Sequence, residues 1–128
     1  VISHVSELFR FSNRMIRHFK FLRTLVIHRM PVRKFDGNFL ENMSQIYYLY
    51  FSFFDIETTA SFSLNQTISK NILSLNIEEN NLKYLEKNSF SMLTNLRNLN
   101  LNFNEIQIIQ AKTFETMRYL KKNGIERQ

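Results

Sequence analysis

The chain contains one pattern of apolar residues written twice, with a 24-residue period, between Ile72 and Leu120. Each copy has eight marked positions, and all eight keep their chemical type in the second copy, including one Asn and one Phe. The first copy consists of Ile72, Leu75, Ile77, Asn80, Leu82, Leu85, Phe90 and Leu93, and the second of Leu96, Leu99, Leu101, Asn104, Ile106, Ile109, Phe114 and Met117. A period of this length predicts a stack of similar supersecondary units, because one unit alone cannot bury its own apolar face.

Within each copy, two apolar residues separated by one other residue predict a short strand with one buried side. These pairs are Leu75 with Ile77, and Leu99 with Leu101. The Asn that follows, Asn80 or Asn104, suits a bend because its amide can both donate to and accept from backbone groups. The Phe of each copy lies on the return segment, where we expect Phe90 and Phe114 to stack and to bury a large area.

This pattern resembles the leucine-rich repeat family, whose consensus LxxLxLxxNxLxxL is followed by a Phe and another Leu. The resemblance implies an α/β solenoid, a right-handed superhelix with a parallel β-sheet on its concave face and irregular or short helical segments on its convex side. It also implies that Asn80 and Asn104 form a ladder between neighbouring turns. The 24-residue period with Phe on the return resembles the typical extracellular class, so we expect a secreted protein or the ectodomain of a membrane-anchored one.

Carrying the period backwards predicts an array over residues 1–119 and an uncapped tail at 120–128. The array would consist of a partial repeat at 1–21 and of repeats at 22–45, 46–71, 72–95 and 96–119. A strict 24-residue step places Ser3 in the slot that Ile27 occupies one repeat later. The repeat from Ile46 is two residues longer, and we expect the extra residues on the return side, where insertions usually fall.

Composition argues against several functional classes. With no Cys the chain has no disulfide and no thiol chemistry, and it lacks the Cys-rich caps of extracellular family members, so we expect it to be part of a longer protein. No apolar run reaches the roughly 20 residues that a membrane-spanning helix needs. Two Gly residues cannot form a phosphate-binding glycine loop, and His4, His18 and His28 are not at metal-ligand spacings. We predict no enzyme activity, no metal and no cofactor.

The net charge of +6 is concentrated near the N-terminus. Residues 1–34 hold eight Lys or Arg and one acid, whereas the remainder holds nine bases and ten acids. The candidate basic patch consists of Arg10, Arg14, Arg17, Lys20 and Arg23. These bases alternate with apolar residues at helical spacing, as in amphipathic helices that bind anionic surfaces. The competing interpretation, which the 24-residue register favours, is the convex turn of the first repeat with its basic side in water.

By the resemblance, the residues beside the inward leucines point outward from the concave face and form a continuous surface, because neighbouring strands lie ~4.8 Å apart. The candidate partner-binding residues are His28, Arg29, Tyr48, Tyr50, Phe53, Glu78, Glu79, Asn100, Asn102 and Phe103. Exposed aromatic residues flanked by charges are common anchors of interfaces. Two alternatives stay open. Phe53 and Phe103 would fold back over the core, or a one-residue slip of the strand at Ile46 would turn Tyr48 and Tyr50 inward.

We therefore predict a non-catalytic recognition module that binds a protein ligand or co-receptor on its concave face. The alternative is binding of an anionic glycan, lipid or nucleic acid by the basic segment 10–34, with nucleic acid the less favoured ligand. Open solenoid edges are a candidate site of self-association, because an edge strand lacks a pairing partner. Asn42 and Asn65 begin N-x-S/T sequons and are candidate glycosylation sites in a secreted protein.

Overall fold

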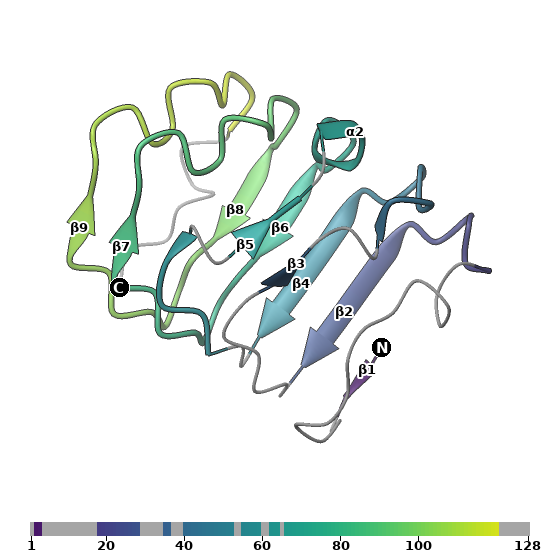
Figure 1. Cartoon of the computed structure of the whole chain (residues 1–128), viewed down its shortest axis with the longest axis horizontal. Coiled ribbons are helices and arrows are strands. Elements are labelled where there is room, and N and C mark those ends of the chain that lie inside the picture. The colour runs from purple at the N-terminus through teal and green to yellow at the C-terminus, as the bar shows by residue number, and fades with distance from the viewer. Residues whose placement is uncertain are drawn as a thin grey trace.

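The computed structural model describes residues 2–3, 18–28, 35–36, 40–52, 55–59, 62–64 and 66–120. The largest element in these ranges is a parallel five-stranded sheet with the order β1-β2-β4-β6-β8, in which the strands follow one another across the sheet as they do along the chain (Figure 1). Its strands are β1 (Ile2–Ser3), β2 (Thr24–His28), β4 (Tyr48–Ser52), β6 (Ser74–Asn76) and β8 (Asn98–Asn100).

The return segments carry shorter elements. Two further strand pairs are parallel: β3 (Phe35–Asp36) pairs with β5 (Phe62–Ser63), and β7 (Tyr84–Leu85) pairs with β9 (Ile108–Ile109). The single helix in the described ranges, α2 (Gln66–Ser69), precedes β6 (Figure 1). A parallel sheet joined by such returns is compatible with the predicted solenoid, whereas the right-handed superhelix stays a prediction.

The strand register has the same spacing as the repeats in the sequence. Thr24 lies opposite Tyr48, and Ser74 lies opposite Asn98, so both pairs keep the 24-residue period. Between these pairs, Tyr48 lies opposite Ser74, a step that is two residues longer. The two additional residues therefore fall in the return between β4 and β6, the segment that contains α2.

The pairing of β1 corrects the sequence prediction by one residue. Ile2 lies opposite Ile27 and Ser3 lies opposite His28, so the step between these strands is one residue longer than the period. The prediction that Ser3 shares the slot of Ile27 was wrong. Ile27 is fully buried, and the longer step places an apolar residue type, Ile2, opposite it in the register.

A continuous apolar core lies between the sheet and the returns. Strand residues that are buried in it include Leu25, Ile27, Leu49, Phe51, Leu75 and Leu99, and return residues include Leu40, Met43, Leu82, Leu85, Leu93 and Met117. Phe90 and Phe114 stack with ring centroids 6.1 Å apart and planes 8° apart, as the sequence predicts. Such a stack contributes about 0.5–1.5 kcal/mol beyond the area that it buries.

Two buried Asn side chains tie the bends after the strands to the repeat before them. The Asn104 Nδ2 donates to the carbonyl oxygens of Ile77 and Leu101, each at 2.8 Å. The Asn80 Nδ2 donates to those of Phe51 and Ile77, each at 3.1 Å. Each amide thus bonds one carbonyl of its own bend and one of the preceding repeat, which fixes how neighbouring bends stack.

Candidate functional site

One side of the large sheet points away from the core, and we call it the outer face. On β4, Leu49 and Phe51 have no exposed surface, whereas Tyr48 is 38% exposed and Tyr50 is partly exposed. This alternation excludes the one-residue slip that would turn the two tyrosines inward. The residues of the outer face are Thr24, Val26, His28, Tyr48, Tyr50, Ser52, Ser74, Asn76, Glu78, Asn98, Asn100 and Asn102.

Smaller side chains flank the two tyrosines at the middle of the outer face. The Cα partners of Tyr48 are Thr24 and Ser74, and those of Tyr50 are Val26 and Asn76. At the end of β2, the His28 Nδ1 lies 3.1 Å from the Ser52 Oγ. The tyrosine rings are therefore the largest groups on this part of the sheet, and they are held on a regular strand.

The part of the outer face over β6 and β8 is polar, and its amides fix one carboxylate. The Asn100 Nδ2 donates to the Glu78 Oε2 at 2.8 Å, and the backbone N–H of Glu78 donates to the Asn76 Oδ1 at 2.9 Å. The same local turn recurs one repeat later, where the Asn102 N–H donates to the Asn100 Oδ1 at 2.9 Å. Asn76 was not among the predicted partner-binding residues, although it lies one full period before Asn100, which was.

The bends after β6 and β8 carry two exposed residues in the left-handed region. Glu79 and Phe103 each have a φ of 55° and occupy the same repeat position, directly before the buried Asn80 and Asn104. Phe103 is 69% exposed, so the alternative in which it folds back over the core is wrong. Of the other predicted partner-binding residues, Arg29 and Phe53 lie outside the described residues.

The predicted basic patch and glycosylation sites are only partly within the described ranges. Lys20 and Arg23 are exposed just before β2, and Asn42 is exposed in a turn. The remaining positions, Arg10, Arg14, Arg17 and Asn65, lie outside the described residues.

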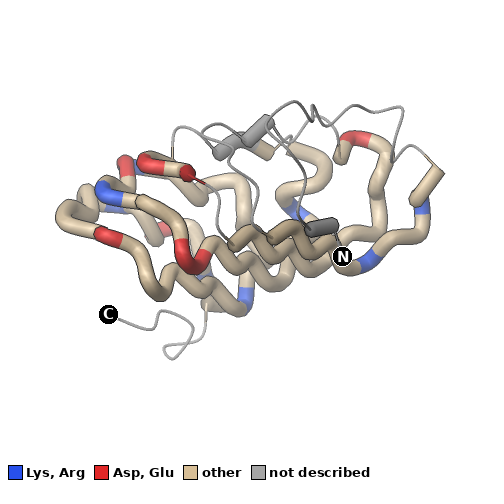
Figure 2. Tube along the Cα trace, turned by 90° about the horizontal axis from the view of Figure 1, so that it is seen from below, with Lys and Arg blue, Asp and Glu red and all other residues tan. Residues whose placement is uncertain are grey.

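Charged side chains in the described ranges are sorted along the strand direction. Those within the four residues before a strand of the large sheet are all basic: Lys20, Arg23, Lys70 and Arg97. Those just after the strands are, apart from Lys83, all acidic: Asp55, Glu57, Glu78, Glu79 and Glu105. Figure 2 shows most Asp and Glu residues in the C-terminal half of the molecule. Although the whole chain has a net charge of +6, its outer face therefore carries negative charge where the structure describes it.

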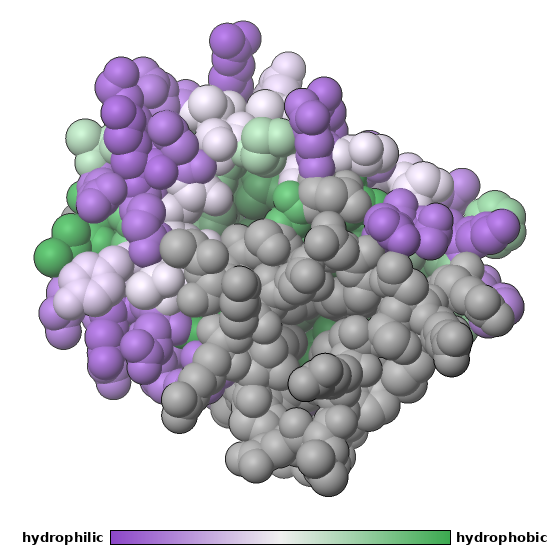
Figure 3. Space-filling view, in the orientation of Figure 1, coloured by the Kyte–Doolittle hydropathy of each residue, from purple (hydrophilic) through white to green (hydrophobic). Residues whose placement is uncertain are grey.

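The β9 strand forms an exposed apolar edge. Ile108 is 50% and Ile109 is 55% exposed, and Figure 3 shows hydrophobic atoms at this edge of the molecule, over β9. On its other side β9 is held to β7. The backbone N–H of Gln107 donates to the carbonyl oxygen of Lys83, just before β7, and that of Gln110 donates to the carbonyl oxygen of Leu85, in β7, both at 3.0 Å. Self-association through such an edge stays a prediction.

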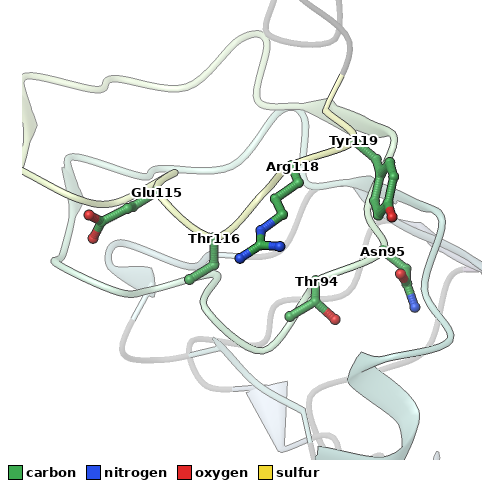
Figure 4. Close-up of a pocket in the computed structure, with 6 residues that line it drawn as sticks. All are labelled: Thr94, Asn95, Glu115, Thr116, Arg118 and Tyr119. Atoms are coloured by element: carbon green, nitrogen blue, oxygen red, sulfur yellow. The ribbon is translucent and has the colours of Figure 1, made fainter.

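A hollow of about 450 Å³ lies between two return segments and is lined by Thr94, Asn95, Glu115, Thr116, Arg118 and Tyr119. In Figure 4 the Arg118 guanidinium points toward Thr94 and Thr116, the Tyr119 ring lies over Asn95, and Glu115 points away. Glu115 instead pairs with Lys112, at 3.8 Å. The lining offers one cation and three hydroxyl groups, and it brings together no pair of acids for general acid–base catalysis.

This hollow marks the end of a second, exposed amide ladder. The Asn71 Nδ2 donates to the carbonyl of Ser44 at 2.9 Å, and the Asn95 Nδ2 donates to that of Lys70 at 2.8 Å. The next position at the same spacing is Tyr119, which has no side-chain amide to continue the ladder. The sequence signal was the 24-residue step between the two Asn residues, which precede the marked repeat positions by one residue.

Neither a metal centre nor a membrane span emerges from the residues that the structure describes. In these ranges, no three His, Asp or Glu side chains gather closely enough to hold a metal ion. No described helix has the length and apolar character needed to cross a bilayer.

The comparison with protein families matches the regular part of the chain. Residues 69–122 match the model described as "Leucine rich repeat", and this range includes β6 to β9, both buried Asn residues and the stacked Phe pair. A comparison with curated proteins gives no match. Leucine-rich repeats generally mediate protein–protein interaction and are typically non-catalytic binding modules. Residues 69–122 of this chain are therefore leucine-rich repeats.

Proposed function

We propose that the chain is a non-catalytic recognition module that binds a protein ligand on its outer face. The observation that carries the proposal is the pair Tyr48 and Tyr50, which stand among smaller side chains at the middle of the sheet. Tyr is enriched among the residues that dominate binding energy at interfaces, because it buries a large apolar area and keeps one polar group.

The support under the two tyrosines favours binding without reorganisation. Leu49 and Phe51, the neighbours of Tyr50 on β4, are fully buried, so the strand cannot rotate without exposing core residues. A preformed surface loses little conformational entropy on association, and that loss is one of the main costs of binding.

The experiment presents a library of random 12-residue peptides, displayed on phage, to the immobilised full chain. Peptides that bind are then measured against Tyr48→Ala and Tyr50→Ala, with Tyr84→Ala as the matched control. Tyr84 is 42% exposed, close to the 38% of Tyr48, but it lies on β7 outside the large sheet. We expect at least a tenfold loss of affinity in the first two variants and less than a twofold change in the control. Equal binding by all three variants would overturn the proposal.

Salt dependence separates this function from the predicted alternative, binding of anionic ligands by segment 10–34. Several phosphate or sulfate contacts would weaken binding more than tenfold between about 50 and 200 mM salt. They would also be lost when Arg10, Arg14 and Arg17 are changed to Gln. Binding through the tyrosines would survive both changes with at most a few-fold loss.

We also propose that the module acts outside the cell, in a secreted protein or the ectodomain of a receptor, where its ligand would be a protein or co-receptor. The 24-residue strand register and the exposed Asn42 support this placement. The test is to express the full-length transcript in cells with a secretory pathway and to treat the product with a glycosidase. We expect a loss of mass that is smaller or absent in Asn42→Gln. A product retained in the cytosol without glycan would contradict the placement.

A further inference from the structure

We infer that the protein ligand presents an arginine side chain to the outer face, between the Tyr50 ring and the Glu78 carboxylate. The inference rests on the proposed function, because it names the chemistry of the partner for the same face. Tyr50, whose ring is partly exposed, pairs with Asn76 on the next strand, and the fixed Glu78 carboxylate belongs to the residue two positions after Asn76.

The spacing of the two groups fits a guanidinium. Tyr50 and Asn76 are Cα partners on β4 and β6, and Glu78 follows two residues after Asn76 on the same side. With strands ~4.8 Å apart and alternate residues ~6.6 Å apart, the Cα atoms of Tyr50 and Glu78 are separated by about 8 Å. A cation that contacts the carboxylate can therefore also lie within the ~6 Å of a ring centroid at which cation–π attraction is significant.

The Glu78 carboxylate is positioned before any ligand arrives. Its Oε2 accepts one hydrogen bond from Asn100, and its backbone N–H is bonded to Asn76. A carboxylate has about four lone-pair sites, so one bond from an amide leaves acceptor capacity for a guanidinium. Because Glu78 is partly buried, an ion pair formed there is screened less than one at a fully exposed position.

The charge of the face agrees with a cationic partner. Among the described residues of the outer face, Glu78 is the one Asp or Glu, and no Lys or Arg is among them. The bend adds Glu79, and the adjoining edge adds Asp55, Glu57 and Glu105. An acidic partner would meet like charges here, whereas a basic one would be attracted and oriented.

Arginine suits this place better than lysine. Its planar guanidinium stacks on aromatic rings and offers several N–H donors in a fixed fork to a carboxylate. It is also more weakly hydrated than an ammonium group, so it loses less solvation energy between a ring and a partly buried acid.

The test uses an array of 12-residue peptides that share one random background and carry Arg, Lys or citrulline at the same positions. Citrulline is the matched probe, because it keeps the shape of Arg and lacks its charge. The full chain is compared with Glu78→Gln and with the control Glu115→Gln, an exposed acid on a return segment. We expect the wild-type chain and the control to bind Arg peptides at least tenfold more tightly than citrulline peptides, with Lys peptides in between.

In Glu78→Gln the affinity for Arg peptides should exceed that for citrulline peptides by less than threefold, while the affinity for citrulline peptides stays unchanged. That unchanged binding also shows that the variant is folded. Tyrosine-dependent binding without any preference for Arg would overturn the inference and leave the proposed function intact. An Arg preference that persists in Glu78→Gln would also overturn it, since the cation would then bind elsewhere. Binding that ignores the tyrosines, or no binding by any peptide, would overturn both proposals.

Discussion

The Asn104 side chain and the backbone of Leu82 are joined across two neighbouring repeats, since the Leu82 N–H donates to the Asn104 Oδ1 at 3.1 Å. The amide nitrogen of Asn104 bonds the carbonyl of Ile77, which also lies in the earlier repeat. One buried side chain therefore satisfies a donor and an acceptor of the adjacent bend. Backbone groups so placed have no access to water, which makes the amide costly to remove.

Replacing Asn104 by Ala should lower the free energy of unfolding by about 2–4 kcal/mol, because at least two buried backbone groups lose their partner at roughly 1–3 kcal/mol each. Urea denaturation of the full chain measures the change. The matched control is Asn95→Ala, whose Nδ2 also donates to a carbonyl of the preceding repeat but in an exposed position. We expect a loss below about 1 kcal/mol there. Equal losses in both variants would contradict the importance of burial.

The stacked rings on the return side make a second prediction. Phe90 is 1% exposed and parallel to Phe114, so Phe90→Ala should cost about 3–5 kcal/mol through lost burial and the cavity left behind. Phe103→Ala removes the same atoms from an exposed site and should change stability by less than about 0.5 kcal/mol. Thermal unfolding followed by circular dichroism distinguishes them. A large loss in Phe103→Ala would mean that this ring is packed after all.

Sequence reasoning succeeded where one residue type has one structural use. The two regular copies place Leu75, Ile77 and Asn80 24 residues before Leu99, Leu101 and Asn104, so the repeats from Ile72 predicted the register of β6 and β8. It failed at β1, because Ile2 and Ser3 are adjacent and the sequence alone did not show which of them pairs with Ile27. In degenerate repeats the choice between two registers is made by the packing of neighbouring strands.

The candidate site was predictable in position but not in detail. Alternation placed Tyr48 and Tyr50 on the outer face, since Leu49 and Phe51 had to be inside. The local roles of Asn76 and Asn100 were not predictable, because an Asn on a strand reads as an ordinary surface residue until its bond to a nearby N–H is seen. The fixed orientation of Glu78 follows from these amides.

A polar contact between returns gives a third prediction. Thr59 is buried and its backbone N–H donates to the Glu86 Oε2 at 3.1 Å, while the Glu86 N–H donates to the Thr59 Oγ1 at 3.2 Å. The Thr59 hydroxyl also donates to the same carboxylate. Thr59→Val keeps the shape and removes the hydroxyl, so we expect a loss of about 1–3 kcal/mol in chemical denaturation.

A double-mutant cycle with Glu86→Gln isolates this contact. If the hydroxyl and the carboxylate act together, the loss in the double variant should be smaller than the sum of the single losses by roughly 0.5–3 kcal/mol. Strict additivity would mean that the two side chains stabilise the returns independently.

The left-handed bends give the last prediction. Glu79 has a φ of 55°, a conformation that costs non-glycine residues roughly 1 kcal/mol because the Cβ approaches the following carbonyl oxygen. Glu79→Gly should relieve that strain and raise the free energy of unfolding by about 0.5–1 kcal/mol, less the entropy that glycine adds to the unfolded chain. Asn81→Gly, at an exposed position of the same bend that is not left-handed, should instead lower it. Urea denaturation of both variants measures the difference. The Glu79 N–H donates to the Asn102 carbonyl at 3.0 Å, so the bend keeps this bond between repeats in the glycine variant. A loss of stability in Glu79→Gly would therefore show that the Glu79 side chain itself supports the fold.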